Sequence, residues 1–311
     1  MNKAIFGLCM GLAVVSGMVA KTGNIVLDSL AAQEDLSILR ELIGRGSFAD
    51  VTSRPQFVTF PFTFLAPSNE AFKKAGDLGT DPRKLKSVLA FHVLNETLYT
   101  QQVVEQGGKT RMAVSNLIDD WYVQLGANKR QMIGLRQTER GIEIVDGTYR
   151  KGEEYPRIIR SDTKAGNGVI HVIDKVLTFP QPISTVLESS EEFSELRSQL
   201  QRSNLGSVLE VAQGVTLFAS DNAGFASSGI SGQTPVEELV SVLGKSIVPG
   251  TALYSSMIVP GTSYQTNNAN YKAQIDLGDN GAVIVGGSKV LRADIIVKNG
   301  VIHRVDKPIL A

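Results

Sequence analysis

Residues 167–177 read NGVIHVIDKVL, and residues 299–310 read NGVIHRVDKPIL. Residues 63–72 read TFLAPSNEAF and residues 216–225 read TLFASDNAGF, so a second pair of similar segments lies upstream. We call residues 63–72 and 216–225 the first box, and residues 167–177 and 299–310 the second box. Two boxes in the same order, each present twice, indicate that the chain contains two copies of one domain.

Hydrophobic spacing within each copy predicts both helices and strands. Apolar residues recur at helical spacing over residues 36–43, after Asp35 as a plausible N-cap, and residues 193–200 repeat the pattern. Residues 62–66 and 215–219 are short apolar runs of the kind that form buried strands. Turn and cap residues follow both runs. This mixture predicts an α+β fold.

The second box predicts a β-hairpin in each copy. Asn167-Gly168 and Asn299-Gly300 each stand between two apolar runs. Asn-Gly pairs supply the positive φ angles that tight hairpin turns need. We therefore expect a strand, a turn at Asn-Gly with positive φ, and a second strand.

The histidines and aspartates of this region favour structural roles. His171 and His303 lie mid-strand, on the opposite face from the isoleucine that precedes each. The sequence contains no His-x-x-x-His motif and no His-Glu pair, so it offers neither a metal site nor a catalytic set. The aspartates at the strand ends are interpreted as caps and turn anchors: Asp162, Asp174, Asp294 and Asp306.

The amino end resembles a secretory signal peptide. Lys3 supplies a positive start, residues 4–20 carry no charge, and small residues lie at Ser16, Gly17 and Ala20. The alternative is a transmembrane anchor, which this short stretch favours less. We expect residues 1–20 to be removed and the protein to be secreted. The single cysteine, Cys9, lies within this segment.

Charge and cysteine content exclude several classes of protein. Lys plus Arg and Asp plus Glu are 31 each, so the net charge is zero, which argues against a nucleic-acid-binding protein. One cysteine excludes a four-cysteine zinc site. No phosphate-binding or dinucleotide-binding motif is present, so we expect no cofactor. No second apolar span follows the signal segment, so we expect no membrane span in the mature chain.

The two boxes resemble the two signatures of the fasciclin domain. The resemblance covers residues 23–178 and 183–310, and the wording of the boxes is more similar to fungal members than to animal ones. It implies an α+β fold of two tandem fasciclin-like domains, each a wedge-like β-sandwich with packed helices. It also implies a secreted or cell-surface protein that binds other macromolecules. In that family, the matching residues Asn167, Gly168, His171 and Asp174, and Asn299, Gly300, His303 and Asp306, are structural signature residues.

The resemblance also indicates one possible contact site. Phe91-His92 stands where the family usually has a Tyr-His pair, so the pair is a candidate for partner binding. The alternative, which we favour, is a packed histidine bonded to backbone carbonyls. The second copy has Lys245-Ser246 at this place, which limits any such contact to the first copy.

Two further surface features are candidates. Asn95-Glu96-Thr97 is the only glycosylation sequon, and we expect a glycan on Asn95 if the loop is exposed. Trp121-Tyr122 combines the lone tryptophan with a tyrosine, residues that are enriched at binding hot spots. We interpret this pair instead as part of a strand core.

Two functions remain open. The first is a non-catalytic adhesion-type protein that binds cell-wall or matrix glycan or another protein. The second, also implied by the resemblance, is an extracellular accessory protein beside laccase and oxygenases that couple aromatic polyketides into pigments or toxins. An enzyme in its own right is the least favoured hypothesis.

Overall fold

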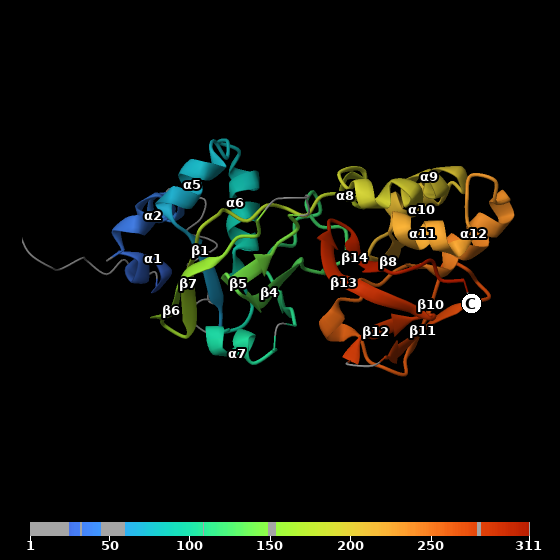
Figure 1. The fold of residues 1–311 in the computed structure, drawn as a ribbon. Coiled ribbons are helices and arrows are strands. Elements are labelled where there is room, and N and C mark those ends of the chain that lie inside the picture. Colours follow the sequence, from blue (N-terminus) through green and yellow to red (C-terminus); the bar gives the residue numbers. More distant parts are fainter. Residues whose placement is uncertain are drawn as a thin grey trace, which may run out of the picture.

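The computed structural model describes residues 25–31, 33–44, 60–107, 109–148, 154–278 and 281–310. The predicted signal segment, residues 1–20, lies outside the described residues. Figure 1 shows two bodies of similar build placed end to end, the first blue to green and the second yellow to red. We call them the first domain, from α1 to β7, and the second domain, from α8 to β14.

The first domain mixes short helices and strands. Its helical elements are α1 (Ile25–Leu30), the 3-10 helix η1 (Glu34–Leu36), α2 (Ser37–Gly44), α5 (Asn69–Ala75), α6 (Pro82–Phe91) and α7 (Thr100–Val104). Its strands are β1 (Thr63–Pro67), β2 (Val93–Leu94), β3 (Arg111–Val114), β4 (Met132–Thr138), β5 (Gly141–Val145), β6 (Ile158–Ala165) and β7 (Gly168–Ile173).

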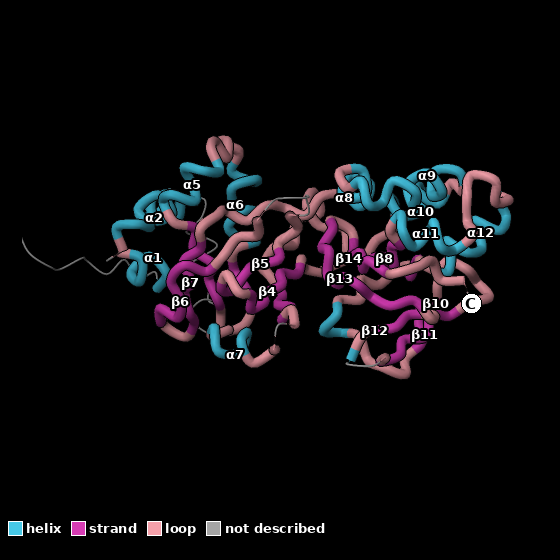
Figure 2. Tube along the Cα trace, in the orientation of Figure 1, coloured by secondary structure: helices cyan, strands magenta, loops and turns pink. Residues whose placement is uncertain are grey.

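The second domain repeats this plan, and Figure 2 shows its helices α8 to α12 along one side of its strands. Its helical elements are α8 (Ile183–Glu188), η2 (Glu191–Phe193), α9 (Ser194–Arg202), α10 (Leu205–Val211), α11 (Asn222–Ser228), α12 (Val236–Lys245) and η3 (Ser255–Met257). Its strands are β8 (Val215–Ser220), β9 (Ile247–Val248), β10 (Ser263–Gln265), β11 (Lys272–Leu277), β12 (Val283–Val285), β13 (Ser288–Val297) and β14 (Gly300–Val305).

The two boxes form neighbouring parallel strands at the centre of each domain. In the first domain β1 pairs with β7 and Thr63 lies opposite Val169. In the second domain β8 pairs with β14 and Thr216 lies opposite Val301. These are matching residues of the two copies, so the register is the same in both domains. The two first-box strands are buried throughout, as the apolar runs predicted.

The remaining strands extend this central pair into sheets. The second domain has one sheet with the order β10-β11-β12-β13-β14-β8-β9. The first domain divides its strands between β2-β1-β7-β6 and β3-β4-β5. Isolated bridges from Leu94 to Ser115 and from Glu143 to Arg157 connect these two sheets. Strands and helices together confirm the predicted α+β fold.

The glycine of the second box is required by close packing and not by the turn. The sequence predicted positive φ at Asn-Gly, and this was wrong: in the β6–β7 turn only Gly166 has positive φ, and none of Lys298, Asn299 and Gly300 does. A Cβ atom on Gly300 would instead lie 1.8 Å from the carbonyl oxygen of Val215 on β8. A Cβ atom on Gly168 would lie 2.5 Å from the carbonyl oxygen of Phe62.

The end of each first box begins a helix and holds the preceding helix in place. The Ser68 hydroxyl accepts from the Ala71 amide, and the Asp221 carboxylate accepts from the Gly224 amide, which confirms the predicted caps. Asn69 Oδ1 accepts from the backbone N–H of Ile38 at the start of α2, at 3.0 Å. Asn222 makes the same contact with α9 in the second domain. Asp35 was predicted as the N-cap of the next helix, and this was wrong: Asp35 lies within η1, and α2 begins at Ser37.

The two domains share a continuous interface. Gln124 of the first domain donates its backbone N–H to Lys298 and accepts from the Gly214 amide with its carbonyl. The Gln131 side chain is fully buried and bonds the Val297 carbonyl and the Tyr254 hydroxyl, each at 3.3 Å. Tyr254 also packs in the same apolar cluster as core residues of the first domain. These contacts pack the two domains against each other.

We predict that Gly300→Ala destabilises the protein by about 3 kcal/mol or more, because the new methyl group must displace the β8 backbone. Gly206→Ala is the matched control: Gly206 lies in α10, and nothing lies within 4 Å of the place where its Cβ atom would stand, so this change should be neutral or stabilise by about 0.5–1 kcal/mol. Urea unfolding followed by circular dichroism measures both. Equal stability of the two variants would contradict the packing argument.

Candidate functional site

Phe91 and His92 lie at the end of α6 and are both fully buried. His92 Nε2 accepts from the backbone N–H of Leu177, at 3.0 Å, and Nδ1 lies 2.7 Å from the Val88 carbonyl. Because Nε2 accepts, Nδ1 carries the proton. The Phe91 ring lies 6.1 Å from the Phe179 ring. The pair therefore joins α6 to the segment that follows β7.

Burial lowers the pKa of His92 from 6.5 to about 4, so the ring is neutral at pH 7. Neither Phe91 nor His92 has exposed surface that a partner could contact in this conformation. The geometry corresponds to the packing alternative and gives the candidate partner-binding pair an internal, structural role. In the second domain Lys245 joins the end of α12 to the segment that follows β14, because its Nζ donates to the Leu310 carbonyl at 2.6 Å.

His171 and His303 have equivalent environments in the two domains. Nε2 of His171 donates to the Leu98 carbonyl at 2.8 Å, and Nε2 of His303 donates to the Leu253 carbonyl at 2.7 Å. Nδ1 of each accepts a backbone N–H, from Asp162 or Asp294. Burial lowers the pKa of both rings. Every ring nitrogen is therefore used in holding the backbone, which leaves none for a metal or a substrate.

The aspartates next to these histidines lie within β6 and β13, and not at the strand ends that the sequence predicted. Asp162 and Asp294 adopt positive φ, 60° and 62°, at irregularities in β6 and β13. Their carboxylates accept from the backbone N–H groups of Thr100 and Ser255, at the starts of α7 and η3. Positive φ is uncommon outside glycine, and aspartate tolerates it better than most residues.

The other signature residues repeat their contacts between the domains. The carboxylate of Asp174 accepts from the Arg157 amide at 2.7 Å, and that of Asp306 accepts from the Lys289 amide at 2.8 Å. The Asn167 side chain donates to the Phe60 carbonyl, and the Asn299 side chain donates to the Leu209 carbonyl. These side chains of the second box bond backbone groups of their own domain.

Asn95 is exposed directly after β2. Its backbone N–H donates to the Val114 carbonyl at 2.9 Å, so the loop is held to the strand beside it. The Thr97 hydroxyl of the sequon donates to the Asn167 carbonyl at 2.9 Å. The side chain of Asn95 is therefore accessible in the folded domain.

Trp121 is 70% exposed, which makes the predicted strand-core role wrong for this residue. It lies in the loop between β3 and β4, and the Arg83 guanidinium stands 5.7 Å from the centre of its ring. Only the neighbouring Tyr122 packs inward, with its ring stacked 3.9 Å from that of Phe179. An exposed lone tryptophan beside an arginine is a candidate binding surface.

Hydrogen bonds hold the Trp121 loop at its start, through Asp119, and at its end, through Gln124. The Asp119 carboxylate accepts from the Trp121 amide at 3.0 Å, which forms a tight turn, and the Asp119 carbonyl accepts from the Tyr122 and Val123 amides. Gln124 then bonds the second domain. Asp119 is the residue in this segment that indicates a turn at residues 119–122 instead of a strand. Nothing in the neighbouring sequence indicates the contact between Gln124 and the second domain.

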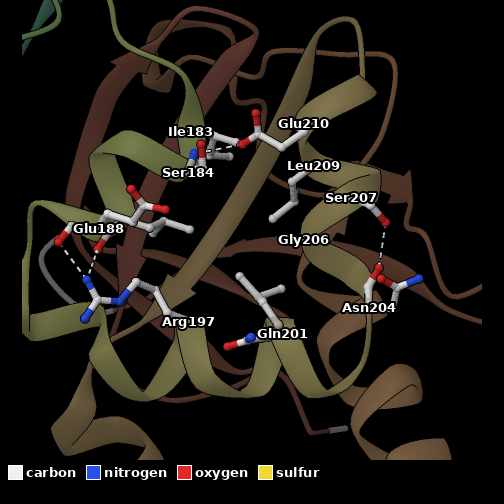
Figure 3. Close-up of a pocket in the computed structure, with 12 residues that line it drawn as sticks. Ile183, Ser184, Glu188, Arg197, Gln201, Asn204, Gly206, Ser207, Leu209 and Glu210 are labelled. Atoms are coloured by element: carbon white, nitrogen blue, oxygen red, sulfur yellow. Dashed lines mark hydrogen bonds between the residues drawn. The ribbon is translucent and has the colours of Figure 1, made fainter.

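A cavity of about 550 Å³ lies among helices α8, α9 and α10 of the second domain. Figure 3 shows that its charged rim is already engaged by the backbone: Arg197 donates to the Glu188 carbonyl at 2.6 Å, and the Glu210 carboxylate accepts from the Ser184 amide at 3.1 Å. Its floor is apolar, with Leu200 and Leu209. The cavity is large enough for a small molecule, but its charged side chains Arg197 and Glu210 already bond backbone groups.

The described residues contain neither a metal-binding cluster nor a membrane-spanning helix. There, no group of three or more His, Cys, Asp or Glu side chains could hold a metal ion. In the same residues, every helix is too short or too polar to cross a bilayer.

Comparison with known protein families gives one match. The model of the fasciclin domain matches residues 34–179 and 191–311. The chain belongs to the fasciclin domain family. This result confirms the predicted family and the presence of two tandem domains. The predicted domain limits, 23–178 and 183–310, and the signal segment 1–20 stay predictions.

Several named proteins are similar to this fasciclin chain. The fasciclin-like arabinogalactan protein CTB11 of Cercospora beticola is 26% identical over 310 residues, covering 96% of this chain and 80% of that protein. A fasciclin-like arabinogalactan protein of Arthroderma benhamiae is 31% identical over 52% of this chain and 39% of that protein. Human periostin is 26% identical over 97% of this chain, which spans only 33% of periostin. The predicted similarity to fungal members is confirmed.

Among solved structures, a fasciclin domain pair from the insect cell adhesion molecule fasciclin I matches with a TM-score of 0.41 and 19% identity. The match covers 89% of this chain and 97% of the insect one.

We predict that His92 makes the protein less stable in mild acid. The unfolded chain binds a proton at this residue below pH 6.5, whereas the folded protein does so only near pH 4, so stability falls as the pH falls between these values. The loss between pH 7.5 and pH 5 should be about 2 kcal/mol from this group. Urea unfolding at both pH values should show a smaller loss in His92→Gln, which does not titrate. Equal losses in both proteins would contradict the buried, neutral histidine.

Proposed function

We propose that this chain is a secreted, non-catalytic binding protein that contacts a macromolecular partner through Trp121 and the surface around it. The partner is cell-wall or matrix glycan, or a protein. The observation that carries this proposal is the 70% exposure of the only tryptophan, on a loop that is hydrogen-bonded within itself and to the second domain.

The order of the Trp121 loop lowers the entropic cost of binding a partner. Tryptophan supplies a large contact area with few rotatable bonds, and it is enriched at binding hot spots. A loop that is already ordered loses little conformational freedom when a partner binds, so more of the contact energy remains as affinity. The guanidinium of Arg83 beside the ring adds a donor group for carboxylates, carbonyls or sugar hydroxyls.

The histidines support a role without chemistry. All three in the chain are buried, and each uses both ring nitrogens in hydrogen bonds to the backbone. Burial lowers the pKa of each, so these rings are held neutral and have no free nitrogen for proton transfer.

The relatives and the predicted signal support an extracellular location. Two of the similar proteins carry the name fasciclin-like arabinogalactan protein, which favours the glycan-rich cell surface or wall as the setting. Secretion through residues 1–20 would deliver the chain there. Asn95 would then be glycosylated, because its side chain is exposed within a sequon.

We predict that Trp121→Ala lowers retention of the partner about 30-fold, the loss expected for a hot-spot tryptophan. The experiment immobilises the mature wild-type and variant proteins and measures binding of culture-medium proteins and of cell-wall polysaccharide from the producing organism. Val211→Ala is the matched control, since Val211 is 80% exposed in the second domain and lies outside the proposed surface. Undiminished retention by Trp121→Ala would refute the proposal.

Two further arms use the same material. Treatment with an N-glycosidase should lower the mass of wild-type protein, and Asn95→Gln protein should show no such change; equal masses before and after treatment of wild type would refute the glycan.

Deleting the gene separates adhesion from the accessory role beside laccase and oxygenases. Altered coloured aromatic products with unchanged adhesion would favour the accessory role over the one proposed.

A further inference from the structure

A second cavity, of about 470 Å³, lies in the first domain between α5, α6 and the segment that follows β7. This volume is within the range of small-molecule binding sites, about 300–1,000 Å³. Its apolar surface comes from Leu78, Val88, Val176 and Phe179, of which Val88 and Val176 are buried. Phe179 adds an aromatic wall. The cavity can therefore accept the apolar or aromatic body of a ligand.

Three lysines line the same cavity: Lys74 on α5, Lys84 on α6 and Lys175 after β7. None of the described residues that line it is acidic. Lys175 donates its Nζ to the Glu154 carbonyl at 2.5 Å. Neither Lys74 nor Lys84 makes a hydrogen bond or an ion pair with another described residue. Two ammonium groups without a direct hydrogen bond therefore lie at a cavity with an apolar wall. The hydrogen bond from Lys73, and beyond it the charge of Lys74, lower the pKa of the Glu70 carboxylate.

We infer that this cavity binds a small amphiphilic anion: an aromatic or aliphatic body that carries a carboxylate, sulfonate or phenolate group. The apolar body packs on Val176 and Phe179, and the anionic group faces Lys74 and Lys84. Three lysines, with no acidic side chain among the described lining residues, attract such a ligand and disfavour cations. A neutral ligand would use only the apolar wall. The inference does not rest on the proposed function at Trp121.

The second domain provides an internal comparison. At the positions that match Lys74 and Lys84 it has Ser227 and Glu238, and only Lys175 is retained, as Lys307. The fold therefore does not require lysine at Lys74 or Lys84. Their presence in the first domain alone is consistent with a charge requirement of that cavity.

The walls of the cavity are held by contacts described above. His92 accepts from the amide of Leu177, which lines the cavity, and Tyr122 stacks on Phe179. The segment after β7 is thus fixed from behind by side chains of the first domain. A ligand meets a preformed wall and does not have to order it.

Fluorescence titration of the whole mature protein with 8-anilino-1-naphthalenesulfonate tests the inference, because this probe joins an aromatic body to a sulfonate. We predict that Lys74→Gln/Lys84→Gln binds the probe about tenfold more weakly than wild type, and that added salt weakens wild-type binding more than variant binding. Lys164→Gln is the matched control, since Lys164 is exposed on β6 and does not line the cavity. The neutral probe N-phenyl-1-naphthylamine should bind wild type and the double variant equally.

Two variants locate the bound probe. Ala75→Trp places an indole at the rim of this cavity and should abolish binding, whereas Ser207→Trp at the α8–α10 cavity should leave it unchanged. Unaltered affinity in Lys74→Gln/Lys84→Gln, or loss of binding in Ser207→Trp alone, would overturn the inference. Trp121→Ala should not affect the titration, so failure of the proposed function and failure of this inference are separable.

Discussion

The close passage of one strand over a glycine in its neighbour is the constraint on which each domain depends. The Val215 carbonyl lies where any side chain on Gly300 would stand, and the Phe62 carbonyl has the same relation to Gly168. This approach allows the two boxes to pair as parallel strands in one register. The pairing in turn places the buried Thr63 and Thr216 hydroxyls against the following loops, where each accepts a backbone N–H at 2.8 Å and donates to a carbonyl at 2.7 Å.

Residues that recur in both copies make matching contacts in the two domains, so the repeat itself indicated that these residues serve the fold. The apolar runs and the caps that follow the first-box strands were predicted correctly from local pattern. The reason for the Asn-Gly pair was not, since the clash of Gly300 with β8 involves a residue far away in sequence. Trp121 was misassigned for a similar reason: its apolar neighbours suggest a strand, whereas Asp119 and the bond from Gln124 to Lys298 place it in an exposed turn.

Polar side chains of the boxes bond backbone groups inside each domain, whereas other polar and aromatic side chains lie at the surface. Histidines, aspartates and asparagines of the boxes satisfy backbone groups, which buried segments need because an unpaired buried N–H or C=O is costly. The groups that the two copies do not share include Trp121, Asn95 and the cavity residues Lys74 and Lys84. The interface through Gln131 joins these features to a second domain that lacks them.

The most direct test of this account is native-state amide hydrogen exchange of the protein. If the parallel pairs of boxes are the stable centre of each domain, the amides of β7 and β14 should exchange most slowly in their domains, with β1 and β8 close behind. The outer strands β10 to β12 should exchange faster. Slowest exchange in those outer strands, or fast exchange throughout β7 and β14, would contradict the central role of the paired boxes.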